Sequence, residues 1–297
     1  MSTVSVALPY YNRQDTLAAA AHSVLEQTHR NLVLIMVNDG STDGSRDVAH
    51  SIRDPRVVHV DADLNLGQPA ARNLGLSAAS SQLVAFMDSD DKWLPTKLER
   101  QLAQLRKWHD ADLNVSVVGC GWQYMGSASS KEFSPGPFGF RDMLQGIAGT
   151  GTPMLLIDRS RAASDVTFDV RLPALVERDY ILSCLRNGSL VGVVPDVLAV
   201  VTRGRKDHVA NPERVARAWE FYLAKYREEL AEDPDLRSWY FFRASREYLV
   251  AGDRRNALRL AKAALTRKPL ARGLHLLLGG VAGSKGLAVA QRLRIAA

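Results

Sequence analysis

The amino-acid sequence predicts an α/β fold in which a mostly parallel, doubly wound sheet is followed by a C-terminal helical extension. Over the first 120 residues strand and helix patterns alternate, which is the order expected of βαβ units. The run over residues 31–39 is apolar almost throughout, as expected of a strand covered on both faces. Helical patterns dominate from Pro212 onward. These observations favour one large sheet domain with a helical appendage.

The elements of the first half follow from length, β-branched content and apolar spacing. Strands are expected over residues 3–9, 31–39, 56–61 and 82–88. Helices are expected over residues 15–27, 43–53, 68–79 and 95–108. The last of these helices carries leucines at positions 98, 102 and 105, which is the spacing of one helix face.

The second half is less regular. Residues 115–201 mix short strands with loops, and the Gly-, Pro- and Phe-rich stretch 131–140 predicts a loop over the edge where the strands end. A strand is expected over residues 152–158, a helix over 174–187 that ends at Gly188, and a strand pair over 190–201. Consecutive helices are expected over residues 212–231, 236–251 and 254–267.

Charge is spread unevenly along the 297 residues, whose formal net charge is +6. From residue 240 to the end there are 12 Lys and Arg against 2 acids, so this tail carries +10 and the rest of the chain −4. A basic tail indicates an acidic partner, either anionic lipid or nucleic acid. The alternative is a set of solvated helix faces that are basic without a partner.

Composition also predicts the compartment. No window reaches the roughly 18 apolar residues that a transmembrane helix needs. The first residues lack a basic leader and are predicted to form a strand rather than a signal peptide. Cys120 and Cys184 give no disulfide framework, so both thiols are expected in the core of a protein in a reducing cytoplasm.

Polar clusters follow the expected strands at their carboxyl ends, where open α/β sheets bind ligands. The densest cluster follows the fourth strand and contains Asp88, Asp90 and Asp91. Like charges this close repel one another. A hard divalent cation, Mg²⁺ or Mn²⁺, would cancel the repulsion and leave positions open for the oxygens of a nucleoside diphosphate. The alternative is a solvated turn in which Asp91 caps the next helix.

Two further residues at this edge allow two interpretations each. Asp39 ends a buried strand, where it could accept hydrogen bonds from N–H or ribose O–H groups, or cap the following helix. Arg72 lies near the start of a helix, where it could meet a phosphate or be an ordinary surface residue. No glycine-rich loop follows any of the first strands, which excludes a dinucleotide-binding turn and a Walker A loop.

Four segments match a known family in order and spacing. On "VSVALPYYN", "VNDGSTDGS", "NLGQPAARNLGL" and "VAFMDSDDKWLPTKLERQ" the sequence resembles the family 2 glycosyltransferases of the GT-A fold, strongly over residues 3–110 and weakly over residues 150–205. The resemblance implies a catalytic domain over residues 1–210 and a basic helical region over residues 211–297. Within the catalytic domain it implies a nucleotide-sugar half, 1–120, and an acceptor half, 121–210.

The resemblance also implies a donor site. Asp39 would contact the nucleobase, and Asp88 and Asp90 of the DXD motif would contact the ribose and a metal ion, either Mn²⁺ or Mg²⁺. The implied nucleotide-sugar residues are Pro9, Tyr11, Asp39, Arg72, Asp88, Ser89 and Asp90.

A catalytic base is implied at a late helix, where "LVERDYILSCLRNG" resembles the family's segment. The usual Glu-Asp pair is spelt Glu177-Arg178-Asp179 here. Asp179 is the first choice of base and Glu177 the second, while the alternative role for Asp179 is to cap its own helix. On the acceptor side or in the following mobile segment, the candidates are Trp93, Thr152, Arg203 and His208. Trp93 could stack on a sugar or pack in the core.

The implied function is an inverting, metal-dependent glycosyltransferase acting on a nucleoside-diphosphate sugar, expected to be a UDP-sugar. It would transfer a hexosyl or N-acetylhexosaminyl group to a carbohydrate or lipid-linked acceptor in bacterial surface polysaccharide or glycoconjugate synthesis. The basic helices would contact the anionic inner face of the membrane, and no nucleic acid is expected. Two alternatives stay open, namely a non-catalytic nucleotide-sugar-binding protein and a nucleotidyltransferase.

Overall fold

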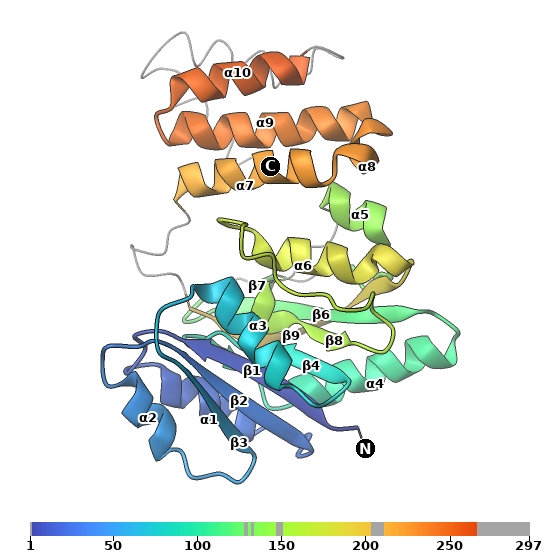
Figure 1. Ribbon diagram of the computed structural model, residues 1–297. Helices are drawn as coiled ribbons and strands as arrows, with labels where there is room; N and C mark the ends of the chain where they lie inside the picture. The colour runs from blue at the N-terminus through green and yellow to red at the C-terminus, as the bar shows by residue number, and fades with distance from the viewer. Residues whose placement is uncertain (1, 128–129, 132–133, 147–150, 203–210, 266–297) are drawn as a thin grey trace. The chain divides into compact units, whose positions relative to one another are not determined.

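The computed structural model describes residues 2–127, 130–131, 134–146, 151–202 and 211–265 (Figure 1). The chain divides into two compact units. The first contains Met1–Val170 and Val176–Arg203, and the second contains Arg171–Leu175 and Gly204–Ala297. The short segment Arg171–Leu175 therefore groups with the helical unit, which the sequence pattern did not indicate.

The first unit is built on a mixed sheet whose order is β3-β2-β1-β4-β8-β6-β9-β5, with β7 beside β6. The strands are β1 (Val4–Tyr10), β2 (Leu32–Asp39), β3 (Val57–Ala62), β4 (Leu83–Phe86), β5 (Lys92–Trp93), β6 (Val115–Tyr124), β7 (Ser130–Lys131), β8 (Leu156–Asp158) and β9 (Leu190–Val201). β8 runs antiparallel to both β4 and β6, and β6 pairs parallel with β9. Six strands, β3, β2, β1, β4, β6 and β9, therefore run in the same direction. This agrees with the prediction of a mostly parallel sheet.

Helices cover both faces of this sheet. They are α1 (Leu17–Leu25), α2 (Ser45–Ser51), α3 (Gln68–Ala78), α4 (Lys97–Asp110), α5 (Phe140–Gln145) and α6 (Val176–Cys184). α1, α2 and α4 share an apolar cluster with one face of β1 and β2. On the other face α3 packs so closely that a Cβ on Gly75 would lie 2.7 Å from the Cβ of Ala7. Glycine is therefore required where α3 crosses β1.

Three expected elements differ from the structure. The expected strand 152–158 begins as a 3₁₀ turn, η1 (Thr152–Met154), because Pro153 fixes its own φ and has no N–H to give to a sheet. The expected strand pair 190–201 is the single strand β9. Pro195 lies where the pairing with β6 is irregular, and a strand inside a sheet tolerates proline at such an irregularity. The expected loop 131–140 begins in β7, ends at the first residue of α5, and carries a bridge from Phe138 to Val191.

The second unit consists of helices α7 (Pro212–Lys225), α8 (Arg227–Ala231), α9 (Pro234–Val250) and α10 (Arg254–Leu265) in the part that the structure describes. The single helix expected over 212–231 is divided at Tyr226, whose torsions are not helical. α9 begins earlier than expected, because Asp233 caps it by accepting a hydrogen bond from the Leu236 N–H, with Pro234 in the first turn. Six of the twelve Lys and Arg residues of the tail lie in 266–297, outside the described residues.

None of the helices in the described part of the chain combines the length and apolar character needed to cross a membrane.

Candidate active site

The parallel strands bring the predicted residues to one edge of the sheet, which we call the carboxyl edge and define by the ends of β1, β2 and β4. Pro9 pairs with Val37 two residues before β2 ends at Asp39. β4 pairs with β1 as far as Ala7 and Phe86, and the Met87 N–H then donates to the Ala7 carbonyl. Residues 9–13, 39 and 88–91 therefore leave the sheet side by side.

Asp39 is almost fully buried and holds the loop that leads into α3. Its Oδ1 accepts from the Leu66 N–H at 2.7 Å and its Oδ2 from the Gly67 N–H at 3.1 Å. It does not cap α2, whose N-cap is Gly44 with no side-chain hydrogen bond. Gly40 has φ +69°, and a Cβ there would lie 2.5 Å from the Leu64 carbonyl carbon. Only glycine lets this loop approach so closely.

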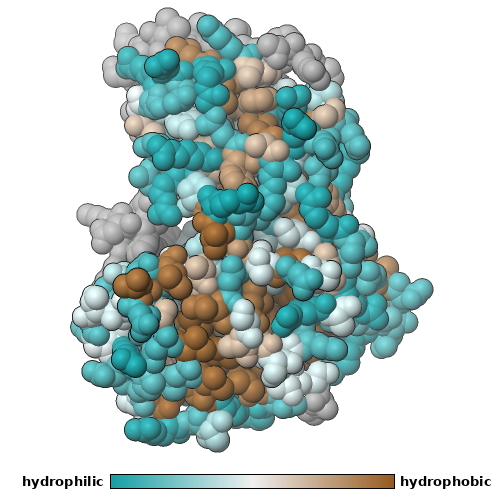
Figure 2. Space-filling model, viewed as in Figure 1, coloured by the Kyte–Doolittle hydropathy of each residue, from teal (hydrophilic) through white to brown (hydrophobic). Residues whose placement is uncertain are grey.

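The loop held by Asp39 presents apolar side chains to solvent. Leu64 is 73% exposed and Leu66 is 52% exposed, and Tyr11 at the same edge is 40% exposed. Figure 2 shows hydrophobic residues grouped on the visible face of the sheet-containing unit. Tyr11 is thus accessible to a ligand at the carboxyl edge, whereas Pro9 is buried within β1.

Arg72 is a buried residue and not a surface one. It is 2% exposed, and its Nη2 lies 2.8 Å from Oδ1 of Asp88. The Phe168 ring, whose centre is 5.4 Å from the guanidinium, closes one side. α3 therefore delivers a fixed positive charge to the first acid of the DXD motif, where charge-assisted hydrogen bonds are strong.

The three neighbouring carboxylates have three different partners. Asp88 pairs with Arg72, and Asp90 lies 3.8 Å from Nε of Arg13. Asp91 is 4% exposed and accepts from the Thr202 N–H at 2.8 Å. Burial, followed by the charge of Asp88, raises the pKa of Asp91 to about 8. The helix after it is capped by Thr96, so the interpretation of Asp91 as a helix cap is wrong.

The sequence pattern missed two residues of this arrangement. Arg13 could have been found, because it follows the first strand at the same edge as the acids. Thr202 carries no local signal, since it follows the end of β9, more than 100 residues further along the chain. Ser89 is buried between the two acids of the DXD motif.

Asp88 and Asp90 offer a donor set that suits a hard divalent cation. In the described part of the chain there is no group of three or more His, Cys, Asp or Glu side chains placed to hold a metal. Two carboxylates are nevertheless what Mg²⁺ or Mn²⁺ takes from a protein when phosphate oxygens and waters complete its shell. Side-chain exposure of 23% for Asp88 and 35% for Asp90 leaves their oxygens reachable from solvent.

Glu177 lies closer to these charges than the sequence indicated. Its pKa is raised mainly by burial, with Arg72 lowering it and Asp88 raising it. Glu177 and Asp179 both lie in the first turn of α6, and residues two apart on a helix do not share a face. The charges of Arg72 and Asp88 thus act on Glu177, and Asp179, on a different side of α6, is only 1% exposed. Leu175, directly before α6, has φ +60° and sets where the helix begins.

The contacts of Arg178 account for the arginine that stands between Glu177 and Asp179. Its Nη2 donates to the Met143 carbonyl at 3.1 Å and to the Leu144 carbonyl at 2.7 Å, both in the last turn of α5. The Met143 carbonyl also accepts from the Gly146 N–H, and the arginine adds a charged donor to both carbonyls at the end of the helix. Arg178 thus connects α5 to the helix that carries Glu177.

The Arg178→Ala variant is expected to destabilise the sheet-containing unit by about 2 to 3 kcal/mol, because two hydrogen bonds from a charged donor are lost. Urea denaturation of the purified full chain measures this change. Arg106→Ala, at an exposed position on α4, is the matched control. Equal unfolding midpoints for the two variants would show that the hydrogen bonds of Arg178 to α5 contribute nothing to the free energy of unfolding.

The predicted acceptor-side residues are buried where they are described. Trp93 and Thr152 are each 3% exposed. The Trp93 Nε1–H donates to the Pro153 carbonyl at 2.8 Å, which favours packing over stacking on a sugar. Arg203 and His208 lie outside the described residues.

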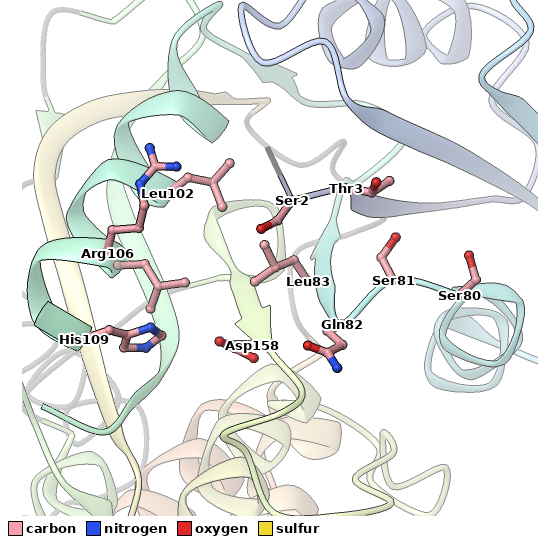
Figure 3. Close-up of a pocket in the computed structure, with 11 residues that line it drawn as sticks. Ser2, Thr3, Ser80, Ser81, Gln82, Leu83, Leu102, Arg106, His109 and Asp158 are labelled. Atoms are coloured by element: carbon pink, nitrogen blue, oxygen red, sulfur yellow. The ribbon is translucent and has the colours of Figure 1, made fainter. Parts of the chain in front are cut away.

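A cavity of about 480 Å³ lies at the opposite edge of the sheet (Figure 3). Its lining includes Ser2, Ser81 and Gln82 before the starts of β1 and β4, with His109 of α4 and Asp158 at the end of β8. None of the predicted site residues lines it. We place the candidate active site at the carboxyl edge, because that is where the paired acids and arginines meet.

The fold and this edge define a class of protein, the glycosyltransferases of GT-A type. The crystal structure of S. aureus TarS 1-349 in complex with UDP-GlcNAc superposes with a TM-score of 0.68, at 16% identity, over 94% of this chain and 84% of that one. The mannosyltransferase PcManGT from Pyrobaculum calidifontis in complex with GDP-Man and Mn²⁺ gives 0.59 at 20% identity, over 97% and 83%. At these identities the likeness concerns the fold alone.

Sequence comparison identifies the family. The model of glycosyl transferase family 2 matches residues 5–160, which is more than half of the chain, and the chain belongs to this family. TuaG of Bacillus subtilis (strain 168), named for teichuronic acid biosynthesis, is 46% identical over 101 residues, which are 33% of this chain and 40% of TuaG. The match thus spans about two fifths of that relative.

A longer match is to WfgD of Escherichia coli, named UDP-Glc:alpha-D-GlcNAc-diphosphoundecaprenol beta-1,3-glucosyltransferase. It is 25% identical over 260 residues, which are 86% of this chain and 95% of WfgD.

Proposed function

We propose that this chain is an inverting glycosyltransferase that moves a hexosyl or N-acetylhexosaminyl group from a UDP-sugar to an acceptor hydroxyl. The observation that carries the proposal is the Arg72–Asp88 ion pair at the carboxyl edge, where Asp39 and Asp90 also lie. The charges of Arg72 and Asp88 also act on Glu177. Membership of glycosyl transferase family 2 supports it, as does the UDP-GlcNAc complex of TarS.

Each residue has a physical role in this reaction. Glu177 takes the proton from the acceptor hydroxyl as that oxygen attacks the anomeric carbon, and the bond to the diphosphate breaks on the opposite side. We propose Glu177 as the base in place of Asp179, because the charges of Arg72 and Asp88 at the carboxyl edge act on Glu177. Burial raises the pKa of Glu177, and a base with a raised pKa holds the abstracted proton more firmly.

Arg72 and the two acids act on the leaving group. The buried Arg72 orients Asp88 and places a positive charge beside the position of the diphosphate. Asp88 and Asp90 would hold Mg²⁺ or Mn²⁺, which when bound would stabilise the charge that builds on the diphosphate. Asp39 would accept a hydrogen bond from the nucleobase.

We further propose a lipid-linked acceptor and a role in surface polysaccharide synthesis. The name of WfgD, a relative over most of this chain, specifies a diphosphoundecaprenol-linked sugar as acceptor. The basic C-terminal region, with a charge of +10 from residue 240 onward, would favour anionic lipid at the inner face of a membrane. This contact is part of the proposal, and much of the region lies beyond residue 265.

A donor panel tests the proposal. Purified protein with Mn²⁺ is given UDP-Glc, UDP-GlcNAc, UDP-Gal and GDP-Man in turn, and the released nucleoside diphosphate is measured. Release from one UDP-sugar, accelerated by a lipid-linked sugar acceptor, is expected.

Ligand-induced stabilisation provides a second measurement. Mn²⁺ and UDP added together should raise the melting temperature more than the sum of their separate effects. UDP at 100 times its dissociation constant in the presence of Mn²⁺ should stabilise the protein by about 2.7 kcal/mol in total. Addition of EDTA should reverse the gain. The absence of a coupled shift, together with no release from any donor, would exclude the proposal.

A further inference from the structure

The second unit includes a short piece of chain that lies, in sequence, within the sheet-containing unit. Arg171–Leu175 groups with the C-terminal helices, whereas the chain up to Val170 and from Val176 onward belongs to the first unit. We call Arg171–Leu175 the connecting segment. It is followed directly by α6, the helix that carries Glu177.

Helix α7 holds the connecting segment by hydrogen bonds to its backbone. The Tyr222 hydroxyl donates to the Leu175 carbonyl at 2.9 Å. Arg214 donates from Nη2 to the Pro173 carbonyl at 2.8 Å. Both side chains come from one side of α7, since their positions are about two helical turns apart.

Tyr222 offers its hydroxyl from a fixed place. It is 0% exposed, and its ring centre lies 5.4 Å from that of Tyr226 and 6.1 Å from that of Tyr240. Its neighbour Phe221 adds a further contact to the connecting segment, with the guanidinium of Arg171 5.3 Å from the centre of its ring. The hydrogen bond to Leu175 is thus supported by packed aromatic rings on α7 and α9.

The carbonyl that Tyr222 contacts belongs to a strained residue. Leu175 has φ +60°, a conformation that a leucine keeps only where the surrounding contacts enforce it. Because Leu175 directly precedes α6, its backbone decides at which residue the helix begins. A helix turns by about 100° per residue, so a start shifted by one residue would point Glu177 in a different direction.

The other end of the connecting segment also leads to the carboxyl edge. Asn73 of α3 binds the backbone of Phe168, accepting from its N–H at 2.8 Å and donating to its carbonyl at 2.9 Å. The Phe168 ring in turn lies against the guanidinium of Arg72. The connecting segment therefore runs between two parts of the candidate active site, Phe168 beside Arg72 and Glu177 in α6.

We propose that Tyr222 is a positioning residue of the second unit, which fixes the Leu175 carbonyl and thereby the start of α6 and the direction of Glu177. The inference rests on the proposed function, since it takes Glu177 as the base. It gives the C-terminal helices a part in sugar transfer that is separate from any contact with lipid. Tyr222 touches neither substrate in this proposal, so its loss should slow transfer and leave nucleotide binding unaffected.

The first test compares Tyr222→Phe with Tyr248→Phe. Both changes remove one hydroxyl from a buried tyrosine of the second unit, but the Tyr248 hydroxyl donates to Oε2 of Glu220 in α7 at 2.6 Å. Expected for Tyr222→Phe are a transfer kcat about tenfold below wild type, because the base is misplaced, and a donor KM and UDP dissociation constant within about twofold of wild type. Tyr248→Phe should keep the wild-type kcat, even where its melting temperature falls as far as that of Tyr222→Phe.

A double variant tests whether Tyr222 acts through Glu177. In the Glu177→Gln background, Tyr222→Phe should cause no further loss of transfer, because a side chain that acts by placing the base then has no base to place. Hydrogen exchange at the amides of residues 176–180 should be faster in Tyr222→Phe than in wild type and unchanged in Tyr248→Phe.

Arg214→Gln tests the same hold from an exposed position, where the change does not threaten folding. The variant loses the donor to the Pro173 carbonyl, so its kcat should fall in the same direction as that of Tyr222→Phe. Arg217→Gln is the matched control, because Arg217 is exposed on the same helix and pairs with Glu213 instead.

Two results would overturn the inference. One is a kcat for Tyr222→Phe equal to that for Tyr248→Phe. The other is a pair of losses that multiply in the double variant, which would show that Tyr222 does not act through Glu177. Failure of the proposed function gives a different pattern, since wild type would then release no nucleoside diphosphate from any donor. Hydrogen exchange would in that case still report whether Tyr222 holds the start of α6.

Discussion

The Glu177→Gln variant is expected to lose sugar transfer by about 10²- to 10⁴-fold, because the amide cannot take the proton from the acceptor hydroxyl. Nucleotide binding should persist, since Gln has nearly the same volume and the Arg72–Asp88 pair is untouched. Steady-state transfer with a saturating UDP-sugar, alongside calorimetric titration with UDP, measures both quantities.

The pH dependence of transfer gives the same residue a second test. The pKa of Glu177 is raised by burial, so its carboxylate form is lost at a higher pH than for an exposed glutamate. Transfer should fall as pH decreases through that raised pKa, and the acidic limb should be absent from the residual activity of Glu177→Gln.

Asp179→Asn is the matched control for the base. Both changes convert a carboxylate of the same helical turn into an amide, but the proposed base is Glu177, on which the charges of Arg72 and Asp88 act. We expect Asp179→Asn to retain far more transfer than Glu177→Gln. The opposite ranking would return the role of base to Asp179.

The second large effect is expected for Asp90→Asn. This change should abolish the coupled stabilisation by Mn²⁺ and UDP and reduce transfer by at least about 10²-fold, because one of two hard carboxylate ligands becomes a neutral amide. The stability of the ligand-free protein should hardly change. Asp90 is 35% exposed in its side chain, and its contact with Arg13 is long at 3.8 Å.

Asp91→Asn separates the roles of the adjacent acids. The asparagine keeps an oxygen that can accept from the Thr202 N–H, so the connection to β9 should survive. We expect this variant to retain the thermal shift with Mn²⁺ and UDP that Asp90→Asn loses. Loss of the shift in both variants would place Asp91 among the metal ligands, contrary to its burial.

The sequence pattern was enough to predict the part of the fold in which each strand is followed directly by a helix. The strands that lead to Asp39 and Asp88 were predictable, because continuous apolar runs give way to acids at or just after their ends. The parallel register then required those acids to lie at one edge. The salt bridge of Arg72 was not predictable, since its partner lies 16 residues away and only the packing of α3 on β1 brings them together.

The orientation of α6, which carries the proposed base, depended on information that spacing does not contain. Whether Glu177 or Asp179 faces the acids is set by the residue at which α6 begins, and Leu175 reaches φ +60° directly before it. No sequence rule assigns a leucine to that conformation, which costs of order 1–3 kcal/mol. Arg178 was read as a departure from the family pattern, yet its partners are carbonyl groups of α5, more than 30 residues earlier.

The two backbone N–H groups that hold Asp39 have a consequence for which nucleobase the site would prefer. A carboxylate fixed by the Leu66 and Gly67 N–H groups is an acceptor with a set direction and no proton to offer. The imide of uracil would supply a proton to it, whereas the bare ring nitrogen of cytosine would present a lone pair and be repelled. Discrimination between uridine and cytidine nucleotides would then come from the sign of one interaction, with no need for a difference in shape.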